Sequence, residues 1–150
     1  MNLPFLRYIP GLGGPPIRQV VAGGNAANSP AATALHYLLT ELPELLLAAV
    51  LDLPTKQLLA TYAAERHYQP SLVAQSVATV VQQAEALRQG QAGEEVEEVL
   101  LTLSGQLHLL RLRPGSQQVL FMAISQHDTN LALARQLAQQ AVKLLAGASS

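Results

Sequence analysis

Apolar residues recur along this chain of 150 residues at two spacings, one typical of helices and one of strands. Ser29 precedes Pro30, a pair that favours a helix start because serine caps free amides and proline tolerates the first helical position. The pattern predicts the order helix–strand–strand–helix–strand–strand–strand–helix. The expected helices cover about residues 30–42, 71–89 and 128–146, with Asp128 as the cap of the last one, and the expected strands are Leu45–Asp52, Lys56–Ala63, Val96–Leu103, Gln106–Arg113 and Gln118–Ile124.

The last three strands form a meander with tight turns at Ser104-Gly105 and Pro114-Gly115. A two-residue turn at Ser104-Gly105 places Leu101 opposite His108 and makes a cross-strand ion pair of Glu98 and Arg111. Both faces of this hairpin are apolar, so helices are expected on both sides of the sheet, one on one face and two on the other. One face carries Val99, Leu101, Leu103, Leu110 and Leu112, and the other carries Leu100, Leu107 and Leu109. This predicts an α+β fold in which helices cover both faces of a sheet.

Residues 1–29 are rich in proline and glycine and are interpreted as an N-terminal tail, followed by one domain over residues 30–147. The tail has an apolar cluster at its tip, formed by Phe5, Leu6, Tyr8 and Ile9. Two interpretations stay open for this cluster. It tucks against its own domain or lacks order, or it is a docking motif for a partner or a neighbouring subunit.

The middle helix has two distinct sides. Its core-facing side is expected to carry Val73, Val77, Val80, Val81, Ala84 and Leu87. Its other side carries Leu72, Ser76, Thr79 and Gln83, which are small or uncharged residues. Solvation alone would favour lysine and glutamate there, so contact with another protein is the expected role of this side.

Composition and charge narrow the classes of function. The chain is 49% hydrophobic and 13% charged, against about 25% charged residues in typical soluble domains. This suggests that another chain covers part of its surface. The net charge of −1 and the presence of only two lysines argue against nucleic acid as a partner. There is no cysteine, no signal-peptide pattern, and no apolar run near the roughly 20 residues of a membrane helix. The expected setting is cytoplasmic, without membrane association.

The sequence offers no convincing catalytic or cofactor site. Gly11-Leu12-Gly13-Gly14 lacks the lysine and hydroxyl ending of a phosphate loop and meets Pro15-Pro16 where a helix would begin. The four histidines, His36, His67, His108 and His127, lack metal-ligand spacing. The acidic run Glu94–Glu98 is typical of a solvated strand edge. We therefore expect no enzyme activity of its own, no metal and no cofactor, and we expect His108 to be a core or interface residue.

The order of elements, with His127-Asp128 leading into Asn130, Leu131 and Arg135, resembles the roadblock family of dynein-light-chain-like domains. The match departs at the first hairpin, where many members have Asp-Gly and this chain has Asp52-Leu53-Pro54-Thr55. The resemblance implies a five-stranded antiparallel sheet with one helix on one face and two on the other. It also implies homodimerisation through the third strands and middle helices, and, in bacteria, regulation of Ras-like small GTPases.

The resulting hypothesis is a non-enzymatic dimeric regulator or scaffold of a Ras-like small GTPase, and the alternative is a sensor-like domain that binds a small molecule. A two-fold axis near Leu100 would set Glu98 opposite Thr102 and avoid stacked glutamates, so Glu98, Leu100 and Thr102 are the predicted dimer interface. Leu72, Ser76, Thr79 and Gln83 are the predicted partner interface. Arg88 is expected to assist binding electrostatically, without acting as an arginine finger.

Overall fold

The computed structural model describes residues 20–22, 29–127 and 129–146. Its elements follow the predicted order, with one short strand added in front, β1 (Val21–Ala22). The others are α1 (Pro30–Glu41), β2 (Leu47–Asp52), β3 (Gln57–Ala63), α2 (Pro70–Leu87), β4 (Glu98–Thr102), β5 (Gln106–Leu112), β6 (Gln118–Ser125) and α3 (Leu131–Ala146). The strands form one sheet in the order β1-β3-β2-β6-β5-β4, and all neighbours are antiparallel. The predicted α+β fold with five antiparallel strands is confirmed, and β1 extends it.

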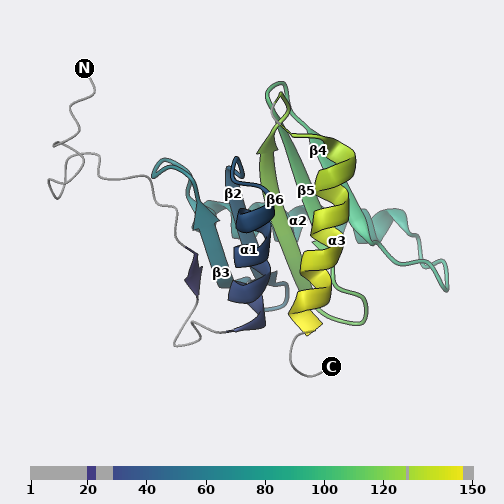
Figure 1. Cartoon of the computed structure of the whole chain (residues 1–150). Helices are drawn as coiled ribbons and strands as arrows, with labels where there is room; N and C mark the ends of the chain where they lie inside the picture. The colour runs from purple at the N-terminus through teal and green to yellow at the C-terminus, as the bar shows by residue number, and fades with distance from the viewer. Residues whose placement is uncertain (1–19, 23–28, 128, 147–150) are drawn as a thin grey trace, which may run out of the picture.

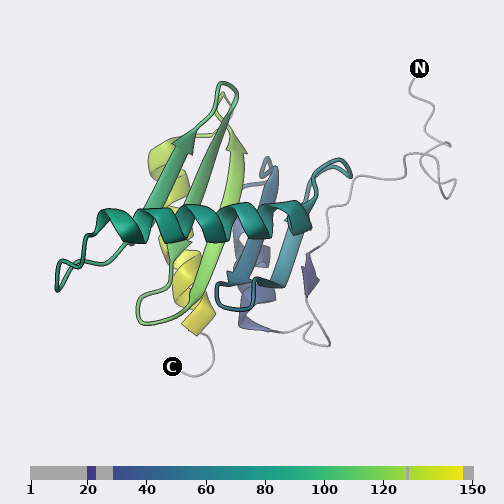
Figure 2. The same ribbon diagram turned by 180° about the vertical axis from the view of Figure 1, so that it is seen from behind.

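Helices cover both faces of the sheet, as predicted. Helices α1 and α3 lie on one face (Figure 1), and α2 crosses the strands on the other (Figure 2). The α1/α3 face holds the larger core, in which the side chains of Leu35, Leu38, Leu109, Leu120 and Met122 are all almost completely buried. The α2 face holds a second, smaller core that includes Val77, Val81, Leu110 and Phe121.

Local side-chain caps explain where two helices begin. The Ser29 hydroxyl accepts a hydrogen bond from the Ala32 amide at 3.1 Å, which confirms the predicted cap of α1. Helix α3 begins at Leu131, three residues later than predicted. Oδ1 of Asn130 accepts from the amides of Ala132 and Leu133 at 2.8 and 3.3 Å, so Asn130 supplies the cap. Asp128, the expected cap, lies outside the described residues.

The hairpin between β2 and β3 turns at Asp52-Leu53-Pro54-Thr55, which contains no glycine. Oδ2 of Asp52 accepts hydrogen bonds from the amide and the hydroxyl of Thr55, at 3.3 and 2.6 Å. Lys56 then takes a left-handed conformation with φ 59°. The Asp52 carboxylate thus organises the turn, which is a role that Asx turns commonly have.

Two features differ from the sequence interpretation. The segment read as a tail contributes β1, in which Val21 pairs with Thr61 and Ala22 with Ala60 of β3. Leu87, expected in the core, is 79% exposed. The reason is visible in Figure 2, where the C-terminal end of α2 extends past the β4 edge of the sheet. The apolar cluster Phe5, Leu6, Tyr8 and Ile9 lies outside the described residues. Among the described residues, no helix is long and apolar enough to cross a membrane.

Candidate functional site: the β4 edge and helix α2

Strand β4 is the last strand of the sheet, so one of its sides is bonded to β5 and the other is open. The Leu103 amide donates to the Gln106 carbonyl at 2.8 Å, and the Leu112 amide donates to the Glu97 carbonyl at 3.0 Å. In an antiparallel ladder, successive residues direct their amide and carbonyl to alternate sides. Odd-numbered residues of β4 therefore face β5. The even-numbered Glu98, Leu100 and Thr102 direct their backbone groups to the open edge.

The register between β4 and β5 is the predicted one, with Glu98 opposite Arg111 and Leu101 opposite His108. Strand β4 is less covered than the sequence predicted, because Leu100 and Leu101 are each 38% exposed. Leu103, directly after the strand, is 45% exposed. Native edge strands usually carry charges, prolines or bulges that discourage pairing with another chain. Strand β4 carries one charged residue, Glu98, and its remaining residues are uncharged, a composition that permits pairing with another chain.

Glu98 takes part in a network of two ion pairs that ties β4 to the rest of the domain. Its Oε1 lies 3.4 Å from Nη1 of Arg111 on β5, as the register predicted. Its Oε2 lies 2.8 Å from Nη2 of Arg135 on α3, a contact that the spacing of residues did not reveal. The only sequence signal was the arginine of the Asn-Leu-x-x-x-Arg pattern. With two arginines beside it, Glu98 adds little net negative charge to the open edge.

The four residues of the predicted partner interface share one exposed side of α2. Leu72 is 67% exposed, and Ser76, Thr79 and Gln83 are also exposed. The hydroxyls of Ser76 and Thr79 donate to the carbonyls of Leu72 and Gln75, one turn back, at 3.4 and 3.0 Å. Because these hydroxyls bond within the helix, the surface that they leave to a partner is more apolar than the sequence suggests.

An apolar groove of about 270 Å³ connects the two predicted surfaces. Leu72 and Ser76 of α2 form one wall, and Leu101 of β4 is part of the opposite side. The residues that line this apolar groove are Leu72, Val73, Ser76, Val77, Val80, Leu101, His108, Leu110 and Phe121. The edge of β4 and the outer side of α2, predicted as two separate interfaces, therefore lie on one continuous surface.

His108 lies in this apolar groove. Its ring meets that of Phe121 edge to face, with centroids 5.3 Å apart, and its Nε2 lies 2.9 Å from Oε1 of Gln106. Burial lowers the pKa of His108 below its ordinary value of 6.5, because an apolar environment disfavours the charged imidazolium. The imidazole is therefore neutral at neutral pH and suits an apolar contact surface.

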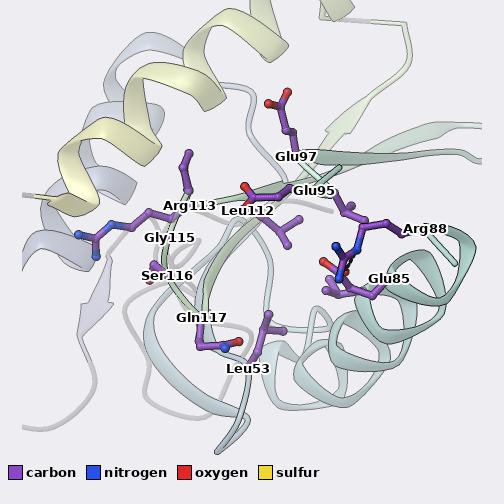
Figure 3. Close-up of a pocket in the computed structure, with 13 residues that line it drawn as sticks. Leu53, Glu85, Arg88, Glu95, Glu97, Leu112, Arg113, Gly115, Ser116 and Gln117 are labelled. Atoms are coloured by element: carbon purple, nitrogen blue, oxygen red, sulfur yellow. Dashed lines mark hydrogen bonds and ion pairs between the residues drawn. The ribbon is translucent and has the colours of Figure 1, made fainter. Parts of the chain in front are cut away.

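Two further hollows lie near the C-terminal end of α2. An edge groove of about 850 Å³ runs along β4 between Leu87 and Ala84 of α2 and Arg135 of α3. A separate cleft of about 520 Å³, here called the α2 cleft, lies between α2, the segment before β4 and the β5–β6 turn (Figure 3). It is lined by Leu53, Val81, Glu85, Arg88, Glu95, Val96, Glu97, Leu112, Arg113, Pro114, Gly115, Ser116 and Gln117.

The arginines of the α2 cleft are engaged within the chain. Arg88 pairs with Glu85 at 2.9 Å and donates to the Glu94 carbonyl at 2.8 Å, so it anchors the segment that follows α2. Arg113 donates to Oε1 of Gln118 at 3.1 Å, and in Figure 3 it points away from Arg88. Within the described part of the chain, no three His, Cys, Asp or Glu residues gather as a metal site.

Comparison with models of protein families and with curated proteins gives no match. Solved structures do match. MglB from Myxococcus xanthus is 17% identical over 75% of this chain and 91% of its own, with a TM-score of 0.65. The gliding protein MglB from Thermus thermophilus is 19% identical over 85% and 93%, with a TM-score of 0.65. A Roadblock/LC7 domain from Streptomyces avermitilis is 13% identical over 76% and 89%, with a TM-score of 0.62. At identities below 20%, this similarity establishes the fold of the chain alone, which is the roadblock fold.

Proposed function

We propose that this protein is a non-enzymatic, dimeric regulator or scaffold of a Ras-like small GTPase, acting in the cytoplasm. The observation that carries the proposal is the continuous surface of open β4 edge, apolar groove and outer side of α2. The apolar groove and the outer side of α2 are low in charge, and the fold is shared with the solved MglB structures. Such a surface suits contact with protein better than contact with solvent.

The open edge gives a specific geometry for the proposed homodimer. Two copies of β4 related by a two-fold axis at Leu100 would pair Leu100 with its counterpart and Glu98 with Thr102. All of these residues direct their backbone groups outward, so each pair would exchange two hydrogen bonds. The two arginines beside Glu98 remove most of the repulsion between the glutamates of the two copies. The second β4 would occupy the edge groove, and its helix α2 would lie on the same face of the joined sheet.

In the proposed dimer, the outer sides of the two α2 helices form a paired platform for the GTPase. Ala84 and Leu87, near the C-terminal end of α2, flank the open β4 edge, so this end of the helix lies nearest the second copy. Leu72 and Ser76 lie toward the other end, beside the apolar groove, and with Thr79 and Gln83 they form the exposed side proposed to meet the GTPase. Arg88 is held by Glu85 and by the Glu94 carbonyl, and inserting it into another protein would break both contacts. An arginine finger accelerates hydrolysis by about 10³–10⁵, and this constraint argues against that role for Arg88.

The test is a binding and GTP-hydrolysis assay with a Ras-like GTPase encoded beside this gene. Thr79→Glu adds a charge to the platform and is expected to abolish association while the protein remains dimeric by light scattering. Gln139→Glu adds the same charge to an exposed position of α3, on the opposite face of the sheet, and serves as the matched control. Arg88→Ala is expected to lower hydrolysis by less than about tenfold. If dimeric Thr79→Glu binds the GTPase fully, the proposed binding surface on α2 is wrong. If Arg88→Ala lowers the rate of GTP hydrolysis a thousandfold, Arg88 acts as an arginine finger.

The α2 cleft favours one alternative, a sensor-like domain that binds a small molecule. Its volume of about 520 Å³ falls within the range of ligand pockets, about 300–1,000 Å³. Since Arg88 and Arg113 are already engaged, a ligand would be held by the apolar walls of Leu53, Val81 and Leu112 and by backbone groups. A ligand-dependent rise in melting temperature that Leu112→Gln removes would support this alternative over the regulator.

A further inference from the structure

The sheet has a second outer strand, β3, and a short piece of the N-terminal segment lies along it. Val21 and Ala22 pair with Thr61 and Ala60, and Val20 packs against the core on the α1/α3 face. In Figure 1, β1 appears as the dark arrow beside β3. This strand covers the edge of the sheet that lies farthest from β4.

Strand β3 lacks most of the features that protect an edge. Gln57–Ala63 contains no charged residue and no proline. Its one irregularity is a register shift against β2, between Val50 and Leu51, which leaves Leu59 without a partner in that ladder. An uncharged edge of this kind readily pairs with another chain. With β1 in place, the middle of β3 is already paired on both sides.

We propose that β1 caps a latent self-association surface, the β3 edge, whose competing partner is a second copy of this chain. Pairing through β4 alone relates two copies by a two-fold axis, so assembly stops at a dimer. If β3 were also open, each dimer would keep two bare edges, and addition of further copies could continue without closure. Residues 20–22 therefore limit assembly to a closed species. The size of the closed species, a dimer, rests on the proposed function. The capping of β3 by β1 does not depend on it.

The test changes β1 within the full-length chain. Val21→Pro with Ala22→Pro removes both amide donors of β1 and leaves Val20 in place. Val21→Thr with Ala22→Thr keeps both donors and favours a strand, so it is the matched control. Sedimentation velocity over a wide range of protein concentrations gives the mass of each variant. We expect the proline variant to reach at least about twice the mass of the unaltered protein, increasing with concentration, and the threonine variant to match the unaltered protein.

A third variant separates edge pairing from the general aggregation of a weakened protein. Thr61→Lys, added to the proline variant, places a charge on the bare β3 edge and is expected to restore the original mass, because charged edges resist pairing. An unchanged mass in the proline variant would overturn the proposal. So would a raised mass that Thr61→Lys fails to lower.

The same measurements distinguish failure of the cap from failure of the β4 dimer. In a chain that also carries Leu100→Pro, the proposed dimer is lost, and the capped protein is expected to be a monomer. Adding Val21→Pro and Ala22→Pro to that chain is then expected to produce association through β3 alone, about a twofold rise in mass. If the unaltered protein is itself a monomer, the dimer proposal fails. In that case the cap still predicts this twofold rise, and a mass that stays monomeric contradicts the cap.

Discussion

The two faces of the sheet are built from similar apolar residues, yet they are covered to different extents. On one face, α1 and α3 lie over the strands, and leucines such as Leu35 and Leu38 are fully buried. On the other, α2 crosses alone, buries Ala74, Val77 and Val81, and leaves an apolar groove beside Leu72 and Leu101. The face with two helices supplies most of the core. The face with one helix keeps apolar surface that the single chain does not cover, which is why we place the interactions there.

The largest expected effect contrasts one leucine from each helical layer. Leu38 of α1 is completely buried, so Leu38→Ala leaves a cavity and should lower the free energy of unfolding by about 2–5 kcal/mol. Leu72 of α2 is 67% exposed, and Leu72→Ala should change the stability of the single chain by about 0.5 kcal/mol or less. Denaturant unfolding of both variants gives the comparison. Similar losses in the two would mean that Leu72 belongs to a core and that the faces do not differ as described.

The next effect concerns association. Leu100 directs its amide to the open edge, so Leu100→Pro removes a donor at the centre of the proposed dimer without breaking the ladder between β4 and β5. We expect light scattering to show a monomer that is still folded by circular dichroism. Leu100→Thr keeps the amide and suits a strand, and it should remain largely dimeric. A dimeric Leu100→Pro protein would place the interface elsewhere.

Much of this arrangement could be predicted from the sequence, because it depends on local spacing and turn chemistry. The hairpin at Ser104-Gly105 fixes the pairing of Glu98 with Arg111, and Ser29-Pro30 marks the start of α1. The sequence predicts Glu98, Leu100 and Thr102 as dimer residues because this register avoids stacked charges, and they are also the residues whose backbone groups face outward. That agreement concerns geometry, and the dimer itself stays a prediction.

What the sequence did not reveal depends on contacts between distant segments. Strand β1 has only two residues, in a stretch dominated by proline and glycine, so its pairing with β3 leaves almost no periodic signal. Arg135 reaches Glu98 from a distant part of the sequence, since α3 packs over the end of the hairpin. Leu87 matches the helical spacing of the core but lies where α2 has passed the edge of the sheet. The spacing of apolar residues alone does not show where a helix extends beyond the edge of the sheet that it covers.

The smallest expected effect is a pH dependence of stability that arises from His108, in the apolar groove on the α2 face. Burial lowers the pKa of His108 below 6.5, so the folded chain binds a proton at this site more weakly than the unfolded chain does. The contribution of His108 to stability is therefore fully present above pH 6.5. It is lost as the pH falls from there through the lower folded pKa. None of the residues that line the groove around His108 carries a charged side chain that would offset this loss.

His108→Leu removes the titrating group and keeps an apolar side chain against Phe121. Subtracting its unfolding free energy from that of the unaltered protein, from about pH 8 to about pH 5, isolates the contribution of His108 from the carboxylates that titrate in both. As the pH falls below 6.5, the unfolding free energy of the unaltered protein should decrease more than that of His108→Leu. If a second copy covers the groove, water is excluded further and the charged imidazolium becomes still less favourable. The dimer of the unaltered protein should then weaken over the same pH range, while that of His108→Leu should not. A flat difference would mean that solvent reaches His108 freely, and the apolar groove would lose its place in the proposed interface.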